Sequence, residues 1–382
     1  MTLFAMAIVL LAGLAGPLLA TPKKTRIPIV VGEIVLGVVV GRTGFGWVNA
    51  DEPVLSYVAS AGFALVMLVA GSHVPLRDAA LRIAAGKGAL LAALVGVLAV
   101  PAGFGVAALV GTGHGLLYVV LLASSSAALV MPVLDETKLT TPPAVALIVQ
   151  VAIADTACIV ALPLAAAPAR AGKAAIGALV VIAAGAVWFL VLRWLHQRGL
   201  VDKAHELSKT RHFGLELRIA LIVLFGLAGL AQLVGVSVML AGFVAGLALA
   251  AVGEPRRLAR QLFAVTDGFL GPVFFVWLGA SLDLRALGQH PVMLVLAALL
   301  AIGAVVVHGA TRLLGQPLPL AVLAGAQLGV PVAAVTIGTH EQLLAPGEGG
   351  AILAAALVSV GVAAWAASRA TKGQTAEVKE AS

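Results

Sequence analysis

The chain has 382 residues, of which 61% are hydrophobic and only 11% are charged, and its formal net charge is +7. A soluble domain typically has about 25% charged residues, so this composition excludes a soluble globular protein. The single cysteine, Cys158, excludes an internal disulfide. The sequence has no Walker-type or GxGxxG loop, no metal-site spacing of His, Cys or Asp and no evident nucleophile–base pair. We therefore expect neither an enzyme nor a cofactor.

Apolar runs of roughly 16 residues or more recur along the whole chain, and most are long enough to cross a bilayer as a helix. They predict an all-α polytopic membrane protein with about 13 transmembrane helices. The first run has no basic segment before it, which predicts a retained helix rather than a signal peptide. The expected spans are residues 3–20, 27–46, 53–71, 88–110, 115–133, 142–166, 174–192, 217–234, 236–252, 265–280, 291–311, 317–339 and 349–367.

The basic residues predict how these helices are oriented. If the N-terminus lies outside the cell membrane and the C-terminus is cytoplasmic, all but four of the 24 Lys and Arg fall in inside segments. The four exceptions are Arg42, Arg170, Lys173 and Arg285. Cytoplasmic loops of membrane proteins carry an excess of Lys and Arg, so the pattern favours this orientation. The positive charge then indicates contact with anionic membrane lipid and no nucleic-acid partner.

The longest polar linker, residues 193–214, separates the first seven expected helices from the last six, as in a duplicated transporter. Helices 4–6 and 11–13 would then be equivalent triplets. The middle helix of each triplet is interrupted, by three serines and a proline within residues 123–132 and by Gly329 and Pro331 within residues 325–335. Matched interruptions indicate a transport site, because unwound backbone exposes amide and carbonyl groups. The alternative is that serine and glycine only allow close helix packing.

Asp155 is a lone carboxylate within the apolar residues 142–168. A charge at the centre of a membrane helix costs roughly 2.5–3.5 kcal/mol on insertion scales, and such residues usually line a route for ions or protons. Alkali cations prefer oxygen ligands. We expect Asp155 to bind both the proton and a transported Na⁺ or K⁺. Further oxygens would come from Thr156, from Ser124, Ser125 and Ser126, and from unwound backbone.

Three further polar residues are possible modulators of this site. Glu33 lies near the inside end of the second helix, where a structural polar contact is favoured over a transport role. Gln327 lies in the second interruption. His308 lies about 17 residues into the eleventh helix, or ~26 Å along it. It is either a packed histidine or a residue that tunes the pH profile.

Four segments, in the same order as in the family, resemble monovalent cation:proton antiporters. They are residues 26–48 (RIPIVVGEIVLGVVVGRTGFGWV), 124–139 (SSSAALVMPVLDETKL), 233–249 (LVGVSVMLAGFVAGLAL) and 272–284 (PVFFVWLGASLDL). The resemblance is to the bacterial branch that contains sodium/proton antiporters and glutathione-gated potassium-efflux proteins. It implies the sodium/proton antiporter fold, with inverted repeats and two crossing broken helices. It also implies a homodimer and a core that moves in alternating access.

The resemblance also implies a division of the chain into domains. Residues 1–83 would form dimerisation-domain helices 1–3, and residues 169–289 helices 7–10, comprising the linker helix and the dimerisation side. Residues 84–168 and 290–367 would form the core, as helices 4–6 and 11–13. Residues 368–382 are expected to be a disordered cytoplasmic tail.

The functional residues of the family are present only in part. Sodium-type members have two adjacent aspartates in helix 6, where this chain has Ala154 and Asp155. His308 occupies what looks like the place of a helix-11 lysine, and no glutamate accompanies Pro331, as it does in potassium-efflux members. A single carboxylate predicts electroneutral exchange of one cation for one proton. The alternatives are a cation channel, a symporter of organic anions with His308 as the only candidate cation, and a membrane enzyme.

Overall fold

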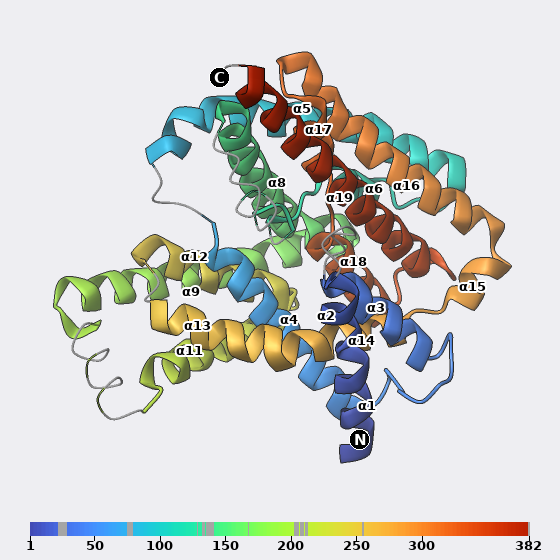
Figure 1. Cartoon of the computed structure of the whole chain (residues 1–382). Helices are drawn as coiled ribbons and strands as arrows, with labels where there is room; N and C mark the ends of the chain where they lie inside the picture. The colour runs from blue at the N-terminus through green and yellow to red at the C-terminus, as the bar shows by residue number, and fades with distance from the viewer. Residues whose placement is uncertain are drawn as a thin grey trace. The chain divides into compact units, whose positions relative to one another are not determined.

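The computed structural model is all-helical, and no strand occurs among the residues that it describes (Figure 1). This confirms the predicted all-α class. The described residues are 1–21, 29–74, 79–127, 129–131, 134, 141–166, 168–201, 206, 210, 213–253 and 256–380. Pro132 of the first interruption lies outside the described residues. So do some of the basic residues counted for the orientation, namely Lys23, Lys24, Arg26, Arg77, Lys138, Lys203, Lys209 and Arg211.

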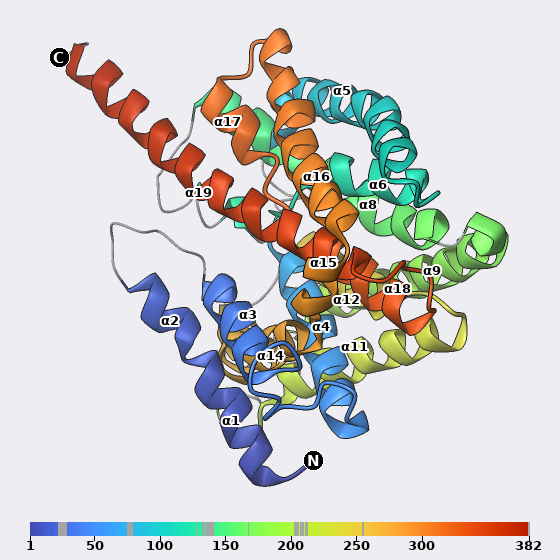
Figure 2. The same cartoon turned by 90° about the vertical axis from the view of Figure 1, so that its right-hand side faces the viewer.

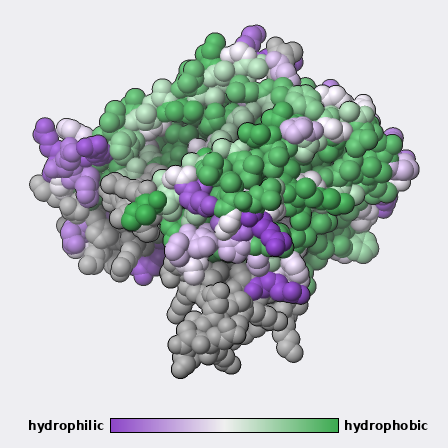
Figure 3. All heavy atoms as spheres, turned by 90° about the horizontal axis from the view of Figure 1, so that it is seen from above, coloured by the Kyte–Doolittle hydropathy of each residue, from purple (hydrophilic) through white to green (hydrophobic). Residues whose placement is uncertain are grey.

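In the described part of the chain, eight helices are long and apolar enough to cross a membrane. Shorter apolar helices accompany them at Leu3–Leu19, Ile29–Val40, Val238–Val252 and Gly329–Thr339. Many large apolar side chains point outward, and Figure 3 shows broad apolar areas on the face that it presents. Such a surface suits a lipid environment. A polytopic membrane protein is therefore confirmed, whereas the expected count of thirteen helices is not.

The chain divides into two compact units, each built from separate stretches of sequence. Unit 1 contains Met1–Ala15, Glu33–Arg77 and Ala169–Ser281. Its helices are α1 (Leu3–Gly13), most of α3 (Ile29–Val40), α4 (Pro53–Ser72), α9 (Ala171–Gln197), α11 (Leu215–Leu233), α12 (Val238–Val252), α13 (Arg256–Val265), the π-helical turn Thr266–Leu270 and α14 (Gly271–Ser281).

Within unit 1, α4 and α12 are in backbone contact. A Cβ atom added to Gly246 would lie 2.1 Å from the carbonyl oxygen of Leu68, and one added to Gly71 would lie 2.3 Å from that of Phe243. Any side chain at either position would force the helices apart. Small residues at helix crossings are a common packing device in membranes, where dispersion replaces the hydrophobic effect.

Unit 2 contains Gly16–Gly32, Asp78–Pro168 and Leu282–Ser382. Its helices are most of α2 (Ala15–Ala20), α5 (Ala79–Val110), α6 (Gly115–Ala123), α8 (Pro142–Ala166), α15 (Leu284–Gln289), α16 (Pro291–Gly309), the 3₁₀ turn Ala310–Leu314, α17 (Leu318–Leu323), α18 (Gly329–His340) and α19 (Glu348–Glu380). A short 3₁₀ turn, Pro168–Arg170, lies where the sequence passes into unit 1. Figures 1 and 2 show α16 and α19 side by side.

Both predicted interruptions lie in unit 2. The helix of α6 ends at Ala123, residues 124–126 are non-helical, and helical structure resumes at Ala127. Residues 324–328 likewise separate α17 from α18. One hydrophobic core holds residues beside both interruptions with parts of α8 and α19. The tail, expected to be disordered from residue 368, is described as a continuation of α19 as far as Glu380.

Candidate functional site

Asp155 is buried in unit 2, with 5% of its surface exposed. It lies on α8, and its Oδ2 atom accepts a hydrogen bond of 3.1 Å from the backbone N–H of Ala127. Ala127 is the residue at which helical structure resumes after the first interruption. The first N–H groups of a helix have no partner within it, and they carry the positive end of its dipole. The carboxylate is therefore placed where the fold can stabilise a negative charge.

The three serines of the first interruption are buried beside this helix start, with exposures of 0%, 1% and 3%. Ser124 donates its hydroxyl to Leu121 in the preceding turn, at 2.8 Å. The backbone oxygen of Ser126 accepts from the N–H groups of Leu129 and Val130. Extended backbone at Ser124 (φ −72°, ψ 149°) ends α6 and turns the chain. The local sequence thus builds a polar, non-helical segment within an apolar core.

The second interruption is tied to the first and to α19. The Ser125 hydroxyl donates to the carbonyl oxygen of Ala324 at 2.7 Å. The backbone N–H of Gln327 donates to the hydroxyl of Ser359 at 3.1 Å. These bonds satisfy backbone groups that unwinding would otherwise leave without partners, as burial in an apolar medium requires.

His308 is fully buried against both interruptions. A Cβ atom added to Gly325 would lie 3.5 Å from its Cβ and Cγ atoms. Its ring is also near the backbone of Leu122 and Ser124, but neither nitrogen has a hydrogen bond by distance and angle among the described residues. The ring thus lies beside both interruptions.

Two buried amides in unit 2 also have polar atoms without partners. Both side-chain atoms of Gln150, on α8, and Nε2 of Gln327 have no hydrogen-bond partner within the described residues. Burying an unsatisfied polar group is costly, so such groups usually mark positions that water or a ligand completes. Sequence reasoning missed Gln150. Its only signal was an uncharged amide in an otherwise apolar run.

The hydrogen bond recorded for Asp155 among the described residues comes from the Ala127 N–H, and none of the expected site residues in unit 2 supplies another. The Thr156 hydroxyl donates to the carbonyl of Ala152 in its own helix, at 2.7 Å. Adjacent residues of an α-helix project about 100° apart, so Thr156 and Asp155 do not share a face. Glu33 is buried, with 3% exposure, but it belongs to unit 1.

A second buried carboxylate in unit 2, Glu348, was not singled out from the sequence. It is fully buried, and its Oε1 atom lies 2.7 Å from the Tyr118 hydroxyl and 2.7 Å from Nδ1 of His114. Its Oε2 atom accepts the N–H of Ala345, at 2.7 Å. Donors thus reach both oxygens, and the cluster fastens the start of α19 to the start of α6. Glu348 directly precedes the expected span at residues 349–367, and an acidic residue at such a position is usually exposed to water.

A sequence model of the sodium/hydrogen exchanger transmembrane family matches residues 6–372. The chain belongs to this family. Its all-helical fold is shared with the solved sodium proton antiporter MjNhaP1 from Methanocaldococcus jannaschii, at a TM-score of 0.64. The two chains are 18% identical, and the match covers 97% of each. The predicted antiporter fold is confirmed by this likeness.

Curated relatives carry the names of cation antiporters. YjbQ of Bacillus subtilis, which bears the name of a Na⁺/H⁺ antiporter, is 24% identical over 93% of this chain and 61% of its own length. The Na⁺/H⁺–K⁺ antiporter GerN of Bacillus cereus is 25% identical over 75% of this chain and 73% of GerN. The glutathione-regulated potassium-efflux protein KefC of Salmonella typhi is 29% identical over 80% of this chain and 50% of KefC. The chain therefore spans about half to three quarters of these relatives.

Proposed function

We propose that this chain is a secondary active antiporter that exchanges a monovalent cation, Na⁺ or K⁺, for protons by alternating access. The observation that carries the proposal is the buried Asp155 carboxylate at the Ala127 N–H, where a broken helix resumes. The names of the relatives support exchange over the channel, the organic-anion symporter and the membrane enzyme.

The proposed chemistry is a competition for one carboxylate. In one half of the cycle Asp155 carries a proton, and in the other it has lost that proton and binds a cation. An ionised and empty Asp155 would be costly to move through apolar surroundings, because an isolated buried charge has no compensation. This penalty would favour exchange over leak of either ion.

Oxygen atoms near the interruptions are the proposed further ligands of the cation. The hydroxyls of Ser124, Ser125 and Ser126 are candidates, together with unwound backbone carbonyls. Thr156 is a weaker candidate, because it does not share a helix face with Asp155. Gln327 and His308 are proposed modulators of the Asp155 site. Glu33 is proposed to make a structural polar contact within unit 1.

We also propose that exchange is electroneutral, with Asp155 as the only carrier. Glu348 is the other fully buried carboxylate described in unit 2. Hydrogen bonds from Tyr118 and the Ala345 N–H, together with the contact to His114, engage both of its oxygens. That engagement supports a structural role for Glu348 rather than a second carrier.

We propose that the protein is a homodimer with a defined orientation in the membrane. Unit 2 would be the mobile core and unit 1 the dimerisation side of a homodimer. The protein would reside in the cell membrane, with its N-terminus outside and its C-terminus in the cytoplasm. Unit 2 holds both interruptions and Asp155, which supports its assignment as the core.

The decisive experiment measures ion exchange by the purified chain in proteoliposomes. A pH gradient is imposed, and its dissipation is followed after Na⁺ or K⁺ is added. Asp155→Asn should insert normally, because it removes an intramembrane charge, and should abolish exchange. Asp51→Asn is the matched control, because Asp51 pairs with Arg42 in an exposed loop. Wild-type exchange by Asp155→Asn would refute the proposal.

A further inference from the structure

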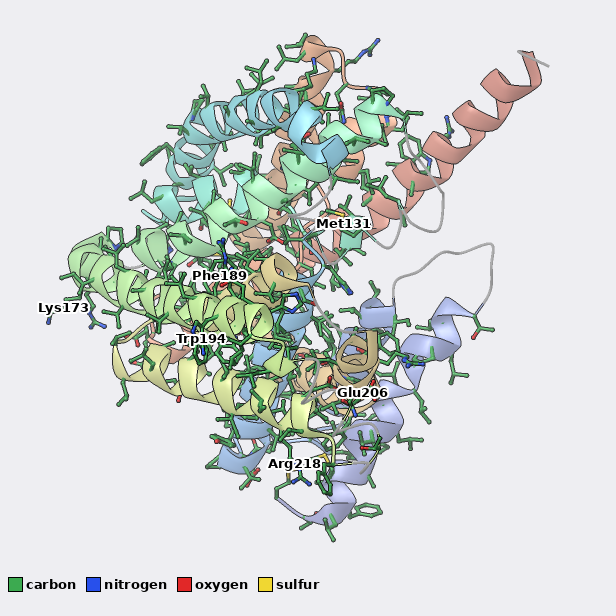
Figure 4. The ribbon with its side chains drawn as sticks, turned by 90° about the vertical axis from the view of Figure 1, so that its left-hand side faces the viewer. Met131, Lys173, Phe189, Trp194, Glu206 and Arg218 are labelled. Atoms are coloured by element: carbon green, nitrogen blue, oxygen red, sulfur yellow. The ribbon has the colours of Figure 1, made fainter. Side chains whose placement is uncertain are left out.

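A pocket of about 250 Å³ lies in unit 1 between the C-terminal ends of α9 and α12. Its lining combines apolar and polar side chains, from Phe189, Arg193, His196, Gln197, Ala251 and Val252. Figure 4 shows Phe189 and Trp194 on α9, and Lys173 near the opposite end of the same helix. The proposed ion exchange does not use this pocket.

The polar part of the pocket is basic. Arg193 and His196 line it, and the guanidinium of Arg198 lies 5.0 Å from the centroid of the Trp194 ring on the same helix end. None of the lining residues is acidic. Each helix C-terminus contributes roughly half a negative charge, which opposes an anion. Arg193 carries a full positive charge in the lining, and Arg198, which does not line the pocket, adds a second at the same end of α9. This helix end therefore favours an anionic ligand.

The helix that supplies most of the pocket lining, α9, also exposes large apolar side chains. Val187 and Leu190 on α9 are 60% and 59% exposed. The exposed Trp194 is of a type enriched at the membrane–water interface. A small free anion would contact only the basic side chains of the pocket. A ligand with a charged head group and hydrocarbon chains would contact both these side chains and the apolar side chains of α9.

We infer that the pocket binds the phosphate head group of an anionic phospholipid, with its acyl chains lying along α9. Basic pockets between transmembrane helices on the cytoplasmic side are suited to such head groups. The orientation expected from the Lys and Arg distribution places the ends of α9 and α12 on that side. Arg193 also begins the polar linker of residues 193–214, so this part of the linker would have a lipid-binding role besides setting topology.

Lipid binding by the delipidated full chain tests the inference. Phosphatidylglycerol or phosphatidylcholine is titrated into the purified protein, and bound lipid is counted by native mass spectrometry. The double variant Arg193→Gln/His196→Gln should bind phosphatidylglycerol at least about fivefold more weakly, because it loses the full charge of Arg193. Arg170→Gln/Lys173→Gln removes two basic residues from the other end of α9 and should bind like the wild type.

Three results would overturn the inference. The first is equal phosphatidylglycerol binding by the wild type and the Arg193/His196 variant. The second is equal binding of phosphatidylcholine and phosphatidylglycerol by the wild type. The third is displacement of the lipid by low millimolar inorganic phosphate, which would indicate a site for free anions. No arm measures transport, so the result is independent of the proposed exchange.

Discussion

The hydroxyl of Ser125 donates a 2.7 Å hydrogen bond to the carbonyl oxygen of Ala324, a residue 199 positions later in the chain. The bond joins the first interruption directly to the second. It satisfies a carbonyl that the end of α17 would otherwise leave buried without a partner. The two interruptions are thereby held as one polar layer inside unit 2.

Removing this bond should destabilise the fold. Ser125→Ala leaves the Ala324 carbonyl without its donor, so we expect a loss of roughly 1–2 kcal/mol, seen as a lower thermal unfolding midpoint in detergent. Ser124→Ala is the control, because that hydroxyl only bonds the carbonyl of Leu121 in its own turn. Equal midpoints for the two variants would contradict a bridging role for Ser125.

The stoichiometry of exchange can be tested electrically. With Asp155 as the only carrier, one cation exchanges for one proton and no net charge moves. An imposed membrane potential at zero pH gradient should therefore drive no uptake of Na⁺ or K⁺ into proteoliposomes. Accumulation driven by the potential through the purified protein would require a second proton carrier.

The predicted topology can be tested by labelling. In a Cys158→Ala background, a cysteine at Gly347 should react with an impermeant reagent from outside the cell. One at Ser208, which lies outside the described residues, should react only from the cytoplasm. The two positions lie on opposite sides if the expected helix order is correct. Reaction of both from outside would overturn the helix count.

The role of His308 can be tested through the pH profile of exchange. A protonated imidazole beside the interruptions would repel the cation, so acid should reduce activity. His308→Gln removes this charge and should extend activity to lower pH, whereas His308→Lys should reduce it there. Asp155-dependent exchange should survive in both. If both variants keep the wild-type profile, His308 has only a packing role.

The interruptions and the buried acid could be predicted because each carries a local signal. Serines and a proline within residues 123–132, Gly329 with Pro331, and a carboxylate in an apolar run all conflict with an uninterrupted lipid-facing helix. The ends of α8 likewise coincide with the expected span at residues 142–166.

Contacts between distant residues could not be predicted in this way. Nothing local pairs Tyr118 with Glu348, which are 230 residues apart, or Ser125 with Ala324. Gln150 was missed because an amide without charge hardly changes the hydropathy of its helix. Thr156 was expected beside Asp155 because the two are adjacent in sequence. Helix geometry instead directs its hydroxyl to Ala152.

The backbone contact between α4 and α12 also constrains the order in which the protein is assembled. Membrane helices are made in sequence, and the face of α4 that includes Gly71 meets α12 only after α5 to α11 have been synthesised. Unit 1 is complete once Ser281 has been added, whereas unit 2 still needs residues 282–382. The helices around Asp155 are therefore in the membrane before residues 282–382, which complete their unit, have been synthesised. During synthesis, the unit that contains Asp155 is therefore the last to be completed.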